Sequence, residues 1–139
     1  MQKKVFAIGS AVLFFTVADV LSVDVYLYDL DISKTRQGWK TAARDLNLFG
    51  KNLQVAGQAY TNGMATHSPS ELYVQLRGAR RFRGAVGVDD SGGQPGKKMV
   101  FQVIADGRLL WQSPPLKRGD APVTADVDLA GFEVALLRV

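Results

Sequence analysis

The segment 82–90 carries the side chains whose chemistry and spacing stand out first. Its apolar residues alternate as in a buried strand, and it ends in two neighbouring carboxylates, Asp89 and Asp90, followed by a glycine-rich loop. Carboxylates fixed at a strand end accept hydrogen bonds from a ligand or bind a cation such as Ca²⁺, which prefers oxygen ligands. Aspartate is also a common turn residue, so a purely structural role for both side chains stays open.

Aromatic and imidazole side chains supply further candidates for ligand contact. Trp39 lies in a long polar loop over 32–52, where an exposed indole would offer a flat apolar surface to a ligand ring. Tyr28 and Tyr60 are reserve candidates of the same kind. His67, the chain's single histidine, either donates a hydrogen bond to a ligand or is a buried imidazole satisfied by the backbone.

Catalytic patterns are weak in this chain. Ser68 and Ser70 lack the nucleophile elbow of a hydrolase, and the sequence contains neither a His-Glu-x-x-His motif nor a phosphate-binding glycine loop. Neighbouring strand residues point to opposite faces, so Asp89 and Asp90 would not flank one glycosidic bond as an acid and base pair. With no cysteine present, disulfides, thiolate metal sites and a cysteine nucleophile are excluded. We expect no catalytic residue and a binding function.

The first 22 residues have the order of parts of a secretory signal peptide. Two lysines precede an apolar run over 5–18, which is shorter than the about 20 residues that span a bilayer. Cleavage after Ala18 or after Ser22 fits this pattern, and a membrane anchor is the alternative. We predict secretion, extracellular or periplasmic, without stable membrane insertion after cleavage.

Length and composition predict a single folded domain. The chain has 139 residues, of which 47% are hydrophobic and 22% charged, and a net charge of +4. The one basic cluster consists of Arg77, Arg80, Arg81 and Arg83 around a turn, a pattern typical of a solvated surface. We expect no nucleic-acid partner.

From residue 23 onward, short alternating segments predict β-strands separated by turns, with one helical turn near 41–46. Asp106-Gly107 tolerates the positive φ angles of a type I′ turn and marks the clearest hairpin, and Ala56-Gly57 between Val55 and Tyr60 suggests another. Trp111, at an alternating position, is expected in the core. About eight strands predict an all-β fold, an antiparallel β-sandwich or jelly roll. The expected strands are 23–27, 53–55, a short one at Tyr60, 72–76, 82–88, 99–105, 108–112, 123–129 and 134–139.

Six blocks, in this order, resemble the NPCBM domain, which is carbohydrate-binding module family 51. The resemblance implies a galactose-binding-domain-like β-sandwich that accompanies a secreted glycoside hydrolase and binds glycans with terminal galactose-type sugars. It also implies a structural calcium ion. The blocks are Tyr26-Leu27-Tyr28-Asp29-Leu30, Gly38-Trp39, the stretch from Tyr60 to Glu71, Val86-Gly87-Val88-Asp89-Asp90, the stretch from Phe101 to Gly107, and 121–129.

The residue chemistry and the resemblance together predict a set of site residues. The chain departs from the family after Gly-Trp, where the family usually has glycine and this sequence has Lys40, and around Met64. These departures keep open an alternative function as a structural or protein-interaction β-sandwich. The carbohydrate-binding residues are expected to be Trp39, His67, Glu71, Asp89 and Tyr28, and the metal ligands Asp90 and Asp89.

The expected domain organisation follows from these points. Residues 1–22 form the signal peptide, and 23–139 form the NPCBM-like β-sandwich. The apolar final segment 134–139 reads as a strand within a sheet, so we expect a domain truncated at its C-terminal strand, with a covalently linked catalytic domain in the longer protein.

Overall fold

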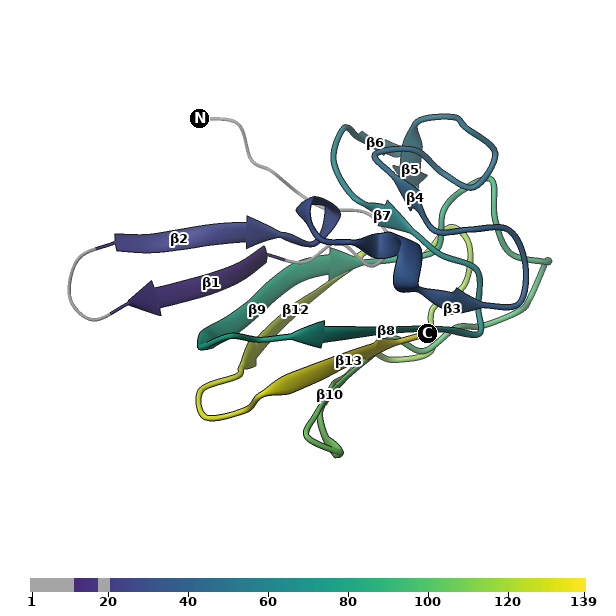
Figure 1. Cartoon of the computed structure of the whole chain (residues 1–139). Coiled ribbons are helices and arrows are strands. Elements are labelled where there is room, and N and C mark those ends of the chain that lie inside the picture. The colour runs from purple at the N-terminus through teal and green to yellow at the C-terminus, as the bar shows by residue number, and fades with distance from the viewer. Residues whose placement is uncertain (1–11, 18–20) are drawn as a thin grey trace.

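Two antiparallel sheets pack face to face in the computed structural model, which describes residues 12–17 and 21–139 (Figure 1). The first sheet has the strand order β12-β9-β1-β2 and the second β11-β10-β13-β8-β3. Two short two-stranded sheets, β4-β7 and β5-β6, gather at one end of the sandwich. The predicted all-β sandwich is thus confirmed.

The first sheet consists of β1 (Val12–Val17), β2 (Leu21–Tyr26), β9 (Ala79–Val86) and β12 (Val123–Asp128). The second consists of β3 (Arg36–Gln37), β8 (Ser70–Gln75), β10 (Gln102–Ala105), β11 (Arg108–Gln112) and β13 (Val134–Arg138). The short sheets pair β4 (Ala43–Arg44) with β7 (Met64–Ala65), and β5 (Leu53–Val55) with β6 (Gln58–Tyr60). Two 3₁₀ helices, η1 (Leu27–Asp29) and η2 (Ile32–Lys34), follow β2.

Period-two alternation places the core between the sheets. On β8, Leu72 and Val74 are buried while Tyr73 is exposed, because successive strand side chains point to opposite faces. The buried side chains of β8 share one cluster with Phe82 of β9 and Val127 of β12, which belong to the facing sheet. This shared cluster is what makes the two sheets one folding unit.

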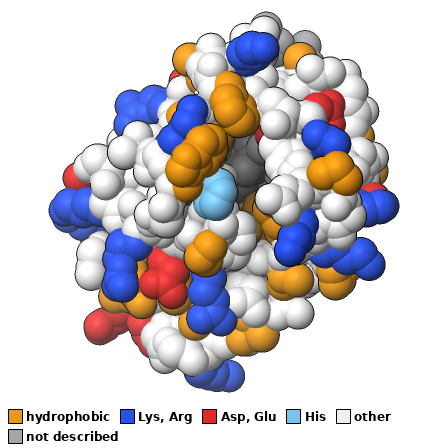
Figure 2. Space-filling model, turned by 90° about the vertical axis from the view of Figure 1, so that its right-hand side faces the viewer, with side chains coloured by type: hydrophobic (Ala, Val, Ile, Leu, Met, Phe, Trp, Pro, Cys, Tyr) orange, Lys and Arg blue, Asp and Glu red, His pale blue; other side chains and the backbone are white. Residues whose placement is uncertain are grey.

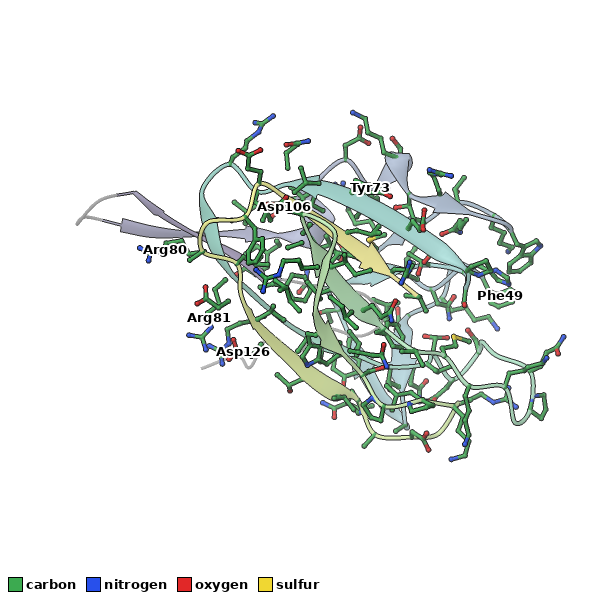
Figure 3. All side chains as sticks on the ribbon, turned by 90° about the horizontal axis from the view of Figure 1, so that it is seen from below. Phe49, Tyr73, Arg80, Arg81, Asp106 and Asp126 are labelled. Carbon is green, nitrogen blue, oxygen red and sulfur yellow. The ribbon has the colours of Figure 1, made fainter. Side chains whose placement is uncertain are left out.

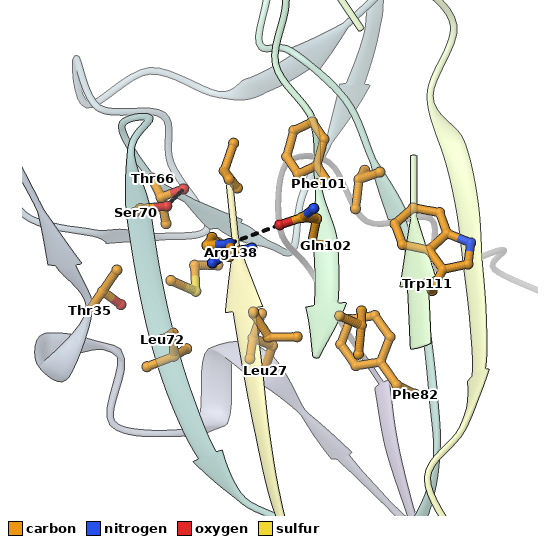
Figure 4. Close-up of a pocket in the computed structure, with 15 residues that line it drawn as sticks. Leu27, Thr35, Thr66, Ser70, Leu72, Phe82, Phe101, Gln102, Trp111 and Arg138 are labelled. Carbon is orange, nitrogen blue, oxygen red and sulfur yellow. Dashed lines mark hydrogen bonds between the residues drawn. The ribbon is translucent and has the colours of Figure 1, made fainter. Parts of the chain in front are cut away.

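A small cavity remains between the sheets (Figure 4). Its volume of about 30 Å³ is close to what one water molecule needs, and Phe82, Phe101 and Trp111 lie on its wall. Trp111 is half-buried and packs against both core clusters, which confirms its predicted place in the core.

The predicted tight turns are present. Asp106 and Gly107 have φ angles of 45° and 79°, and they join β10 to β11 as expected for a type I′ turn. Ala56 and Gly57, at 50° and 80°, join β5 to β6 in the same way. The turn after Leu76 carries the chain from β8 to β9, which lies in the opposite sheet.

The loop before β5 differs from its prediction. The expected helical turn over 41–46 is wrong, because Ala43 and Arg44 form β4 and pair with Ala65 and Met64. Tertiary pairing overrides the weak local helical preference here. The short strands β3, β4 and β7, two residues each, were also not anticipated, since two residues show no alternation.

The predicted signal peptide is only partly within the described residues. Residues 1–11 and 18–20 lie outside them, whereas Val12–Val17 forms β1 and pairs with β2 and β9. No helix in the described part of the chain is long and apolar enough to cross a membrane.

The arginines around the β8–β9 turn include a surface ion pair (Figure 3). Arg81 of β9 contacts Asp126 of β12 at 2.6 Å between Nε and Oδ1, and Arg83 approaches the other carboxylate oxygen at 3.4 Å. The hydrogen bond from Arg81 lowers the pKa of Asp126 below its usual value. Part of the cluster thus serves cross-strand pairing on a solvated face.

Gly87 lies where two layers come very close. A Cβ atom built on Gly87 would lie 2.7 Å from Cγ1 of Val55 and 3.6 Å from Cα of Pro122. Val55 is fully buried and β-branched, so its side chain has little freedom to move away. The backbone at Gly87 therefore approaches the neighbouring layer so closely that it leaves no room for a side chain.

The substitution Gly87→Ala is expected to destabilise the domain by about 1–3 kcal/mol, because the added methyl group overpacks the core against Val55. Urea denaturation followed by tryptophan fluorescence measures this loss. Gly38→Ala is the control, since a Cβ there meets nothing within 4 Å. Equal stabilities of the two variants would contradict the close approach.

Candidate functional site

A cleft of about 520 Å³ opens at the end of the sandwich where the short sheets lie. Its walls come from Trp39 and the segment 47–49, from the segment 65–68, from residues between 87 and 94 that follow β9, and from Lys97-Lys98-Met99. Figure 2 shows the chain's histidine beside a hollow in this face, with hydrophobic side chains next to it. Segments far apart in sequence thus meet around one cavity.

One wall of the cleft is aromatic. Trp39 and Phe49 are 44% and 52% exposed, and their ring centroids lie 5.9 Å apart in a tilted arrangement. The ammonium group of Lys40 lies 4.7 Å from the Trp39 centroid and 4.6 Å from that of Phe49, and it donates a 2.7 Å hydrogen bond to the carbonyl of Leu48. These contacts hold two exposed apolar rings in place beside the cleft.

The structure explains why lysine can stand at position 40, where the family usually has glycine. Its φ angle is 56°, in the left-handed region that glycine adopts most readily. Lysine bears the backbone strain of that position, and its side chain gains the contacts with both rings.

His67 adjoins the aromatic wall. Its ring lies edge-on to Trp39 with centroids 5.3 Å apart, and its backbone N–H donates to the side-chain oxygen of Gln37 at 3.4 Å. The Nδ1 atom is shielded and has no hydrogen-bond partner among the described residues. The half-buried imidazole lines the cleft and its Nδ1 is not satisfied by the backbone, so the expectation of a buried, backbone-satisfied imidazole is wrong, whereas a contact with a ligand stays a prediction.

Asp89 contributes to the floor of the cleft as a buried acceptor. It is 6% exposed, and its Oδ1 accepts hydrogen bonds from Ser91 N at 2.9 Å, from the Ser91 hydroxyl and from Asn47 Nδ2 at 3.3 Å. Its Oδ2 accepts from Gln54 N at 2.9 Å. The carboxylate thereby joins three segments of the chain and has little acceptor capacity left for a ligand.

Asp90 holds the neighbouring hairpin. Its two oxygens accept from the backbone N–H groups of Ala56 at 3.0 Å and Gly57 at 2.8 Å, in the turn between β5 and β6. The Asp90 backbone N–H in turn donates to the carbonyl of Gln54 at 2.8 Å. Both carboxylates thus attach the β5–β6 hairpin to the end of β9. Of the two roles considered from the sequence, the structural role in a turn is closer to this arrangement than the binding of a ligand or cation.

Glu71 lies away from the cleft, and the structure does not describe the side chain of Tyr28. Glu71 lies on β8 between Arg36 and Arg138, its register partners on β3 and β13, and it is not part of the cleft wall. Tyr28 lies in η1, and its side chain is outside the described part. The reserve candidate Tyr60 is wrong, because its ring is buried in the core at 5% exposure, where burial raises the pKa of its phenol.

Comparison with known proteins places this architecture in a family. The family model for the NPCBM/NEW2 domain matches residues 23–139. The chain belongs to the NPCBM/NEW2 domain family. A Renibacterium salmoninarum protein named as an endo-alpha-N-acetylgalactosaminidase is 30% identical to this NPCBM/NEW2 domain over 124 residues, covering 84% of the chain. The match spans only 8% of that much longer relative.

Solved structures with the same fold include CBM51 modules from Clostridium perfringens. The CBM51 of GH95 in complex with methyl-galactose superimposes with a TM-score of 0.73 at 24% identity, over 82% of this chain and 84% of that one. The CBM51-2 and INT domains of ZmpB give a TM-score of 0.74 at 20% identity, over 93% of this chain and 32% of that one. The NPCBM/NEW2 domain described here therefore has the fold of carbohydrate-binding modules.

The donor set at Asp89 and Asp90 does not fit the calcium ion that the family resemblance implies. Backbone and side-chain donors occupy their oxygens, and Ca²⁺ needs six to eight oxygen ligands. Within residues 12–17 and 21–139, no group of three or more His, Cys, Asp or Glu residues is arranged to hold a metal ion. These two side chains are better explained as structural acceptors.

Calcium is accordingly expected to leave the melting temperature unchanged. A cation that bound only the folded domain would stabilise it by about 2.7 kcal/mol at a hundredfold excess over its dissociation constant. Differential scanning calorimetry in calcium and in chelator measures the difference. A clear rise with calcium that Asp90→Asn abolishes would contradict this assignment.

The structure also brings residues to the cleft that no sequence motif marks. Asn47 links Asp89 to the aromatic wall, because its Oδ1 accepts from the backbone N–H groups of Phe49 and Lys51, each at 3.0 Å. Lys97 and Lys98 lie at the far end of the glycine-rich loop. The only sequence signal for these residues was their position in the two loops already marked as long or glycine-rich.

Proposed function

We propose that this NPCBM/NEW2 domain is a non-catalytic carbohydrate-binding module that holds a terminal galactose-type sugar in the cleft. The observation that carries the proposal is the pair of exposed rings, Trp39 and Phe49, beside His67 in a cavity of about 520 Å³. The C–H face of a sugar packs against an aromatic ring, and nearby polar groups select its hydroxyls.

The comparisons support this proposal without deciding the sugar. The CBM51 of GH95 was solved with methyl-galactose, and the CBM51-2 of ZmpB with GlcNAc, so modules of this fold bind more than one sugar type. The relative named as an endo-alpha-N-acetylgalactosaminidase and the CBM51 modules of larger enzymes support a role in targeting a covalently linked glycoside hydrolase to glycans.

Isothermal titration of the chain with methyl-galactoside tests the proposal, with methyl-glucoside as the matched control. We expect weak, selective binding of galactoside, because each sugar hydroxyl gives up hydrogen bonds to water and nets only about 0.5–1.5 kcal/mol. No heat with any neutral sugar, together with an empty glycan array, would refute it.

A second candidate function, protein interaction, is supported by an apolar row across the outer face of the second sheet. Tyr73, Leu136, Ile104 and Leu109 are register neighbours on β8, β13, β10 and β11. Tyr73 and Leu109, at the ends of the row, are 55% and 54% exposed. An exposed apolar row is a feature of protein-interaction surfaces, so the alternative of an interaction β-sandwich keeps a structural basis.

We further propose that the protein is exported and that its signal peptide is removed. Intact-mass measurement of the exported protein is expected to give a start at Asp19 or Val23, because cleavage follows Ala18 or Ser22. Such cleavage removes β1, so the edge of β9 that pairs with it becomes free. Retention of Met1, or resistance to a carbonate wash of membranes, would support the anchor alternative.

A further inference from the structure

The exposed charged side chains at the walls of the cleft are of one sign. Lys40, Lys97 and Lys98 are exposed at or beside its walls, and Asp89 is the single acidic side chain among the described residues that line it. Asp89 is buried, and hydrogen-bond donors surround both of its oxygens. Figure 2 shows lysine and arginine side chains on both sides of the hollow.

The loop that presents the lysine pair is anchored at both ends. Gly92 N donates to the carbonyl of Asp89 at 2.8 Å, and Lys97 N donates to that of Gln94 at 3.1 Å. Directly after Lys98, Met99 exchanges two backbone hydrogen bonds with Leu116, at 2.7 and 2.8 Å. The two ammonium groups therefore extend from a backbone that is fixed relative to the cleft.

The lysine pair is also free of strong partners within the described residues. Neither Lys97 nor Lys98 forms an ion pair there. The charge of Asp120 reaches Lys98, but that carboxylate is already paired with Lys117 at 2.6 Å. Lys40 differs, because two rings and the Leu48 carbonyl already contact its ammonium group. Lys40 therefore adds positive charge beside the cleft but is not positioned to donate a hydrogen bond to a ligand.

We propose that the cleft recognises an acidic glycan, in which Trp39 receives the sugar ring and Lys97 and Lys98 receive an anionic substituent on that sugar, a sulfate or a carboxylate. The inference rests on the proposed sugar-binding function and deepens it. A neutral sugar gives the ammonium groups no opposite charge, whereas an anionic substituent is attracted over the cleft by several cations at once. Because the lysines are exposed, this attraction is screened by salt.

The test is titration of the chain with methyl-galactoside, galactose 6-sulfate and galacturonic acid at low and at high sodium chloride. At low salt we expect at least one acidic sugar to bind about fivefold more tightly than the neutral one, and this preference to vanish at high salt. The two acidic sugars distinguish sulfate from carboxylate as the preferred group. Inorganic sulfate is the competitor that detects a site for anions alone.

Two double variants with the same loss of charge make the test specific. Lys97→Ala with Lys98→Ala is expected to lower the affinity for the acidic sugars to that for methyl-galactoside, and so to abolish the preference. Lys34→Ala with Arg80→Ala, both exposed and outside the cleft wall, is expected to keep the preference.

The outcomes separate this inference from the function on which it rests. Equal affinity for neutral and acidic sugars overturns the anionic site and leaves galactose binding intact. Loss of the preference in the Lys34 and Arg80 control, or displacement by inorganic sulfate as strong as by the sulfated sugar, also overturns it. Absence of binding by any sugar overturns both, whereas binding of acidic sugars alone supports the lysine pair and refutes the neutral galactose site.

Discussion

Replacing Asp89 with alanine is expected to lower the free energy of unfolding by about 3 kcal/mol. The carboxylate is buried, and its removal leaves the N–H groups of Gln54 and Ser91 and the amide of Asn47 without their acceptor. A buried donor that loses its partner costs its full desolvation penalty, which exceeds the net gain from an average hydrogen bond. Urea denaturation measures the loss as a lower midpoint with an unchanged slope.

Asp90→Ala is the matched control for this prediction. Its carboxylate also accepts two backbone hydrogen bonds, from Ala56 and Gly57, but at an exposed turn where water replaces it. We expect a loss of about 1 kcal/mol. Equal losses in the free energy of unfolding for the two variants would show that the contribution of Asp89 to stability does not depend on its burial.

Local turn chemistry made much of the sandwich predictable. Asp106-Gly107 and Ala56-Gly57 adopt positive φ angles at both positions, which few residue pairs tolerate, and each joins two strands where expected. Alternation on β8 and β12 likewise identified the buried faces. These features depend on residues that are neighbours in sequence, so they can be recognised from the sequence alone.

Strand partners and short strands were not predictable in the same way. The residues of β8 and β9 are joined by a tight turn, as in a hairpin, yet they lie in different sheets. β4 forms because Ala43 and Arg44 meet β7, about twenty residues further along the chain. The pairing of these strands depends on contacts between residues far apart in the chain, which a short segment of sequence does not contain.

The candidate site was only partly predictable, because it too depends on contacts between distant parts of the chain. Trp39 and His67 were chosen for their chemistry, and the fold does bring their rings to 5.3 Å. The function of Asp89 was hidden, because its partners are mostly backbone N–H groups that every sequence position offers. Lys97 and Lys98 were not predictable, since in sequence an exposed lysine pair is no different from ordinary solvated surface and only the fold shows the cleft beside it.

Trp39→Ala is expected to reduce the affinity for the galactose-type ligand at least about tenfold, which corresponds to about 1.4 kcal/mol. The indole is 44% exposed, so its surface is available to a sugar ring, while Lys40, Phe49 and His67 hold it in one orientation. The same exposure limits its share in the core, and we expect the melting temperature to change by only a few degrees. Titration calorimetry and thermal denaturation measure the two effects separately.

Tyr73→Ala is the control that separates the cleft from the apolar row on the second sheet. Tyr73 is 55% exposed, somewhat more than Trp39, but it lies on the outer face of β8 and does not line the cleft. Its removal should leave sugar affinity unchanged, because exposed aromatic area alone does not bind a sugar without the polar groups of a cavity. A loss of affinity in Tyr73→Ala, or undiminished binding in Trp39→Ala, would move the sugar site from the cleft to the sheet face.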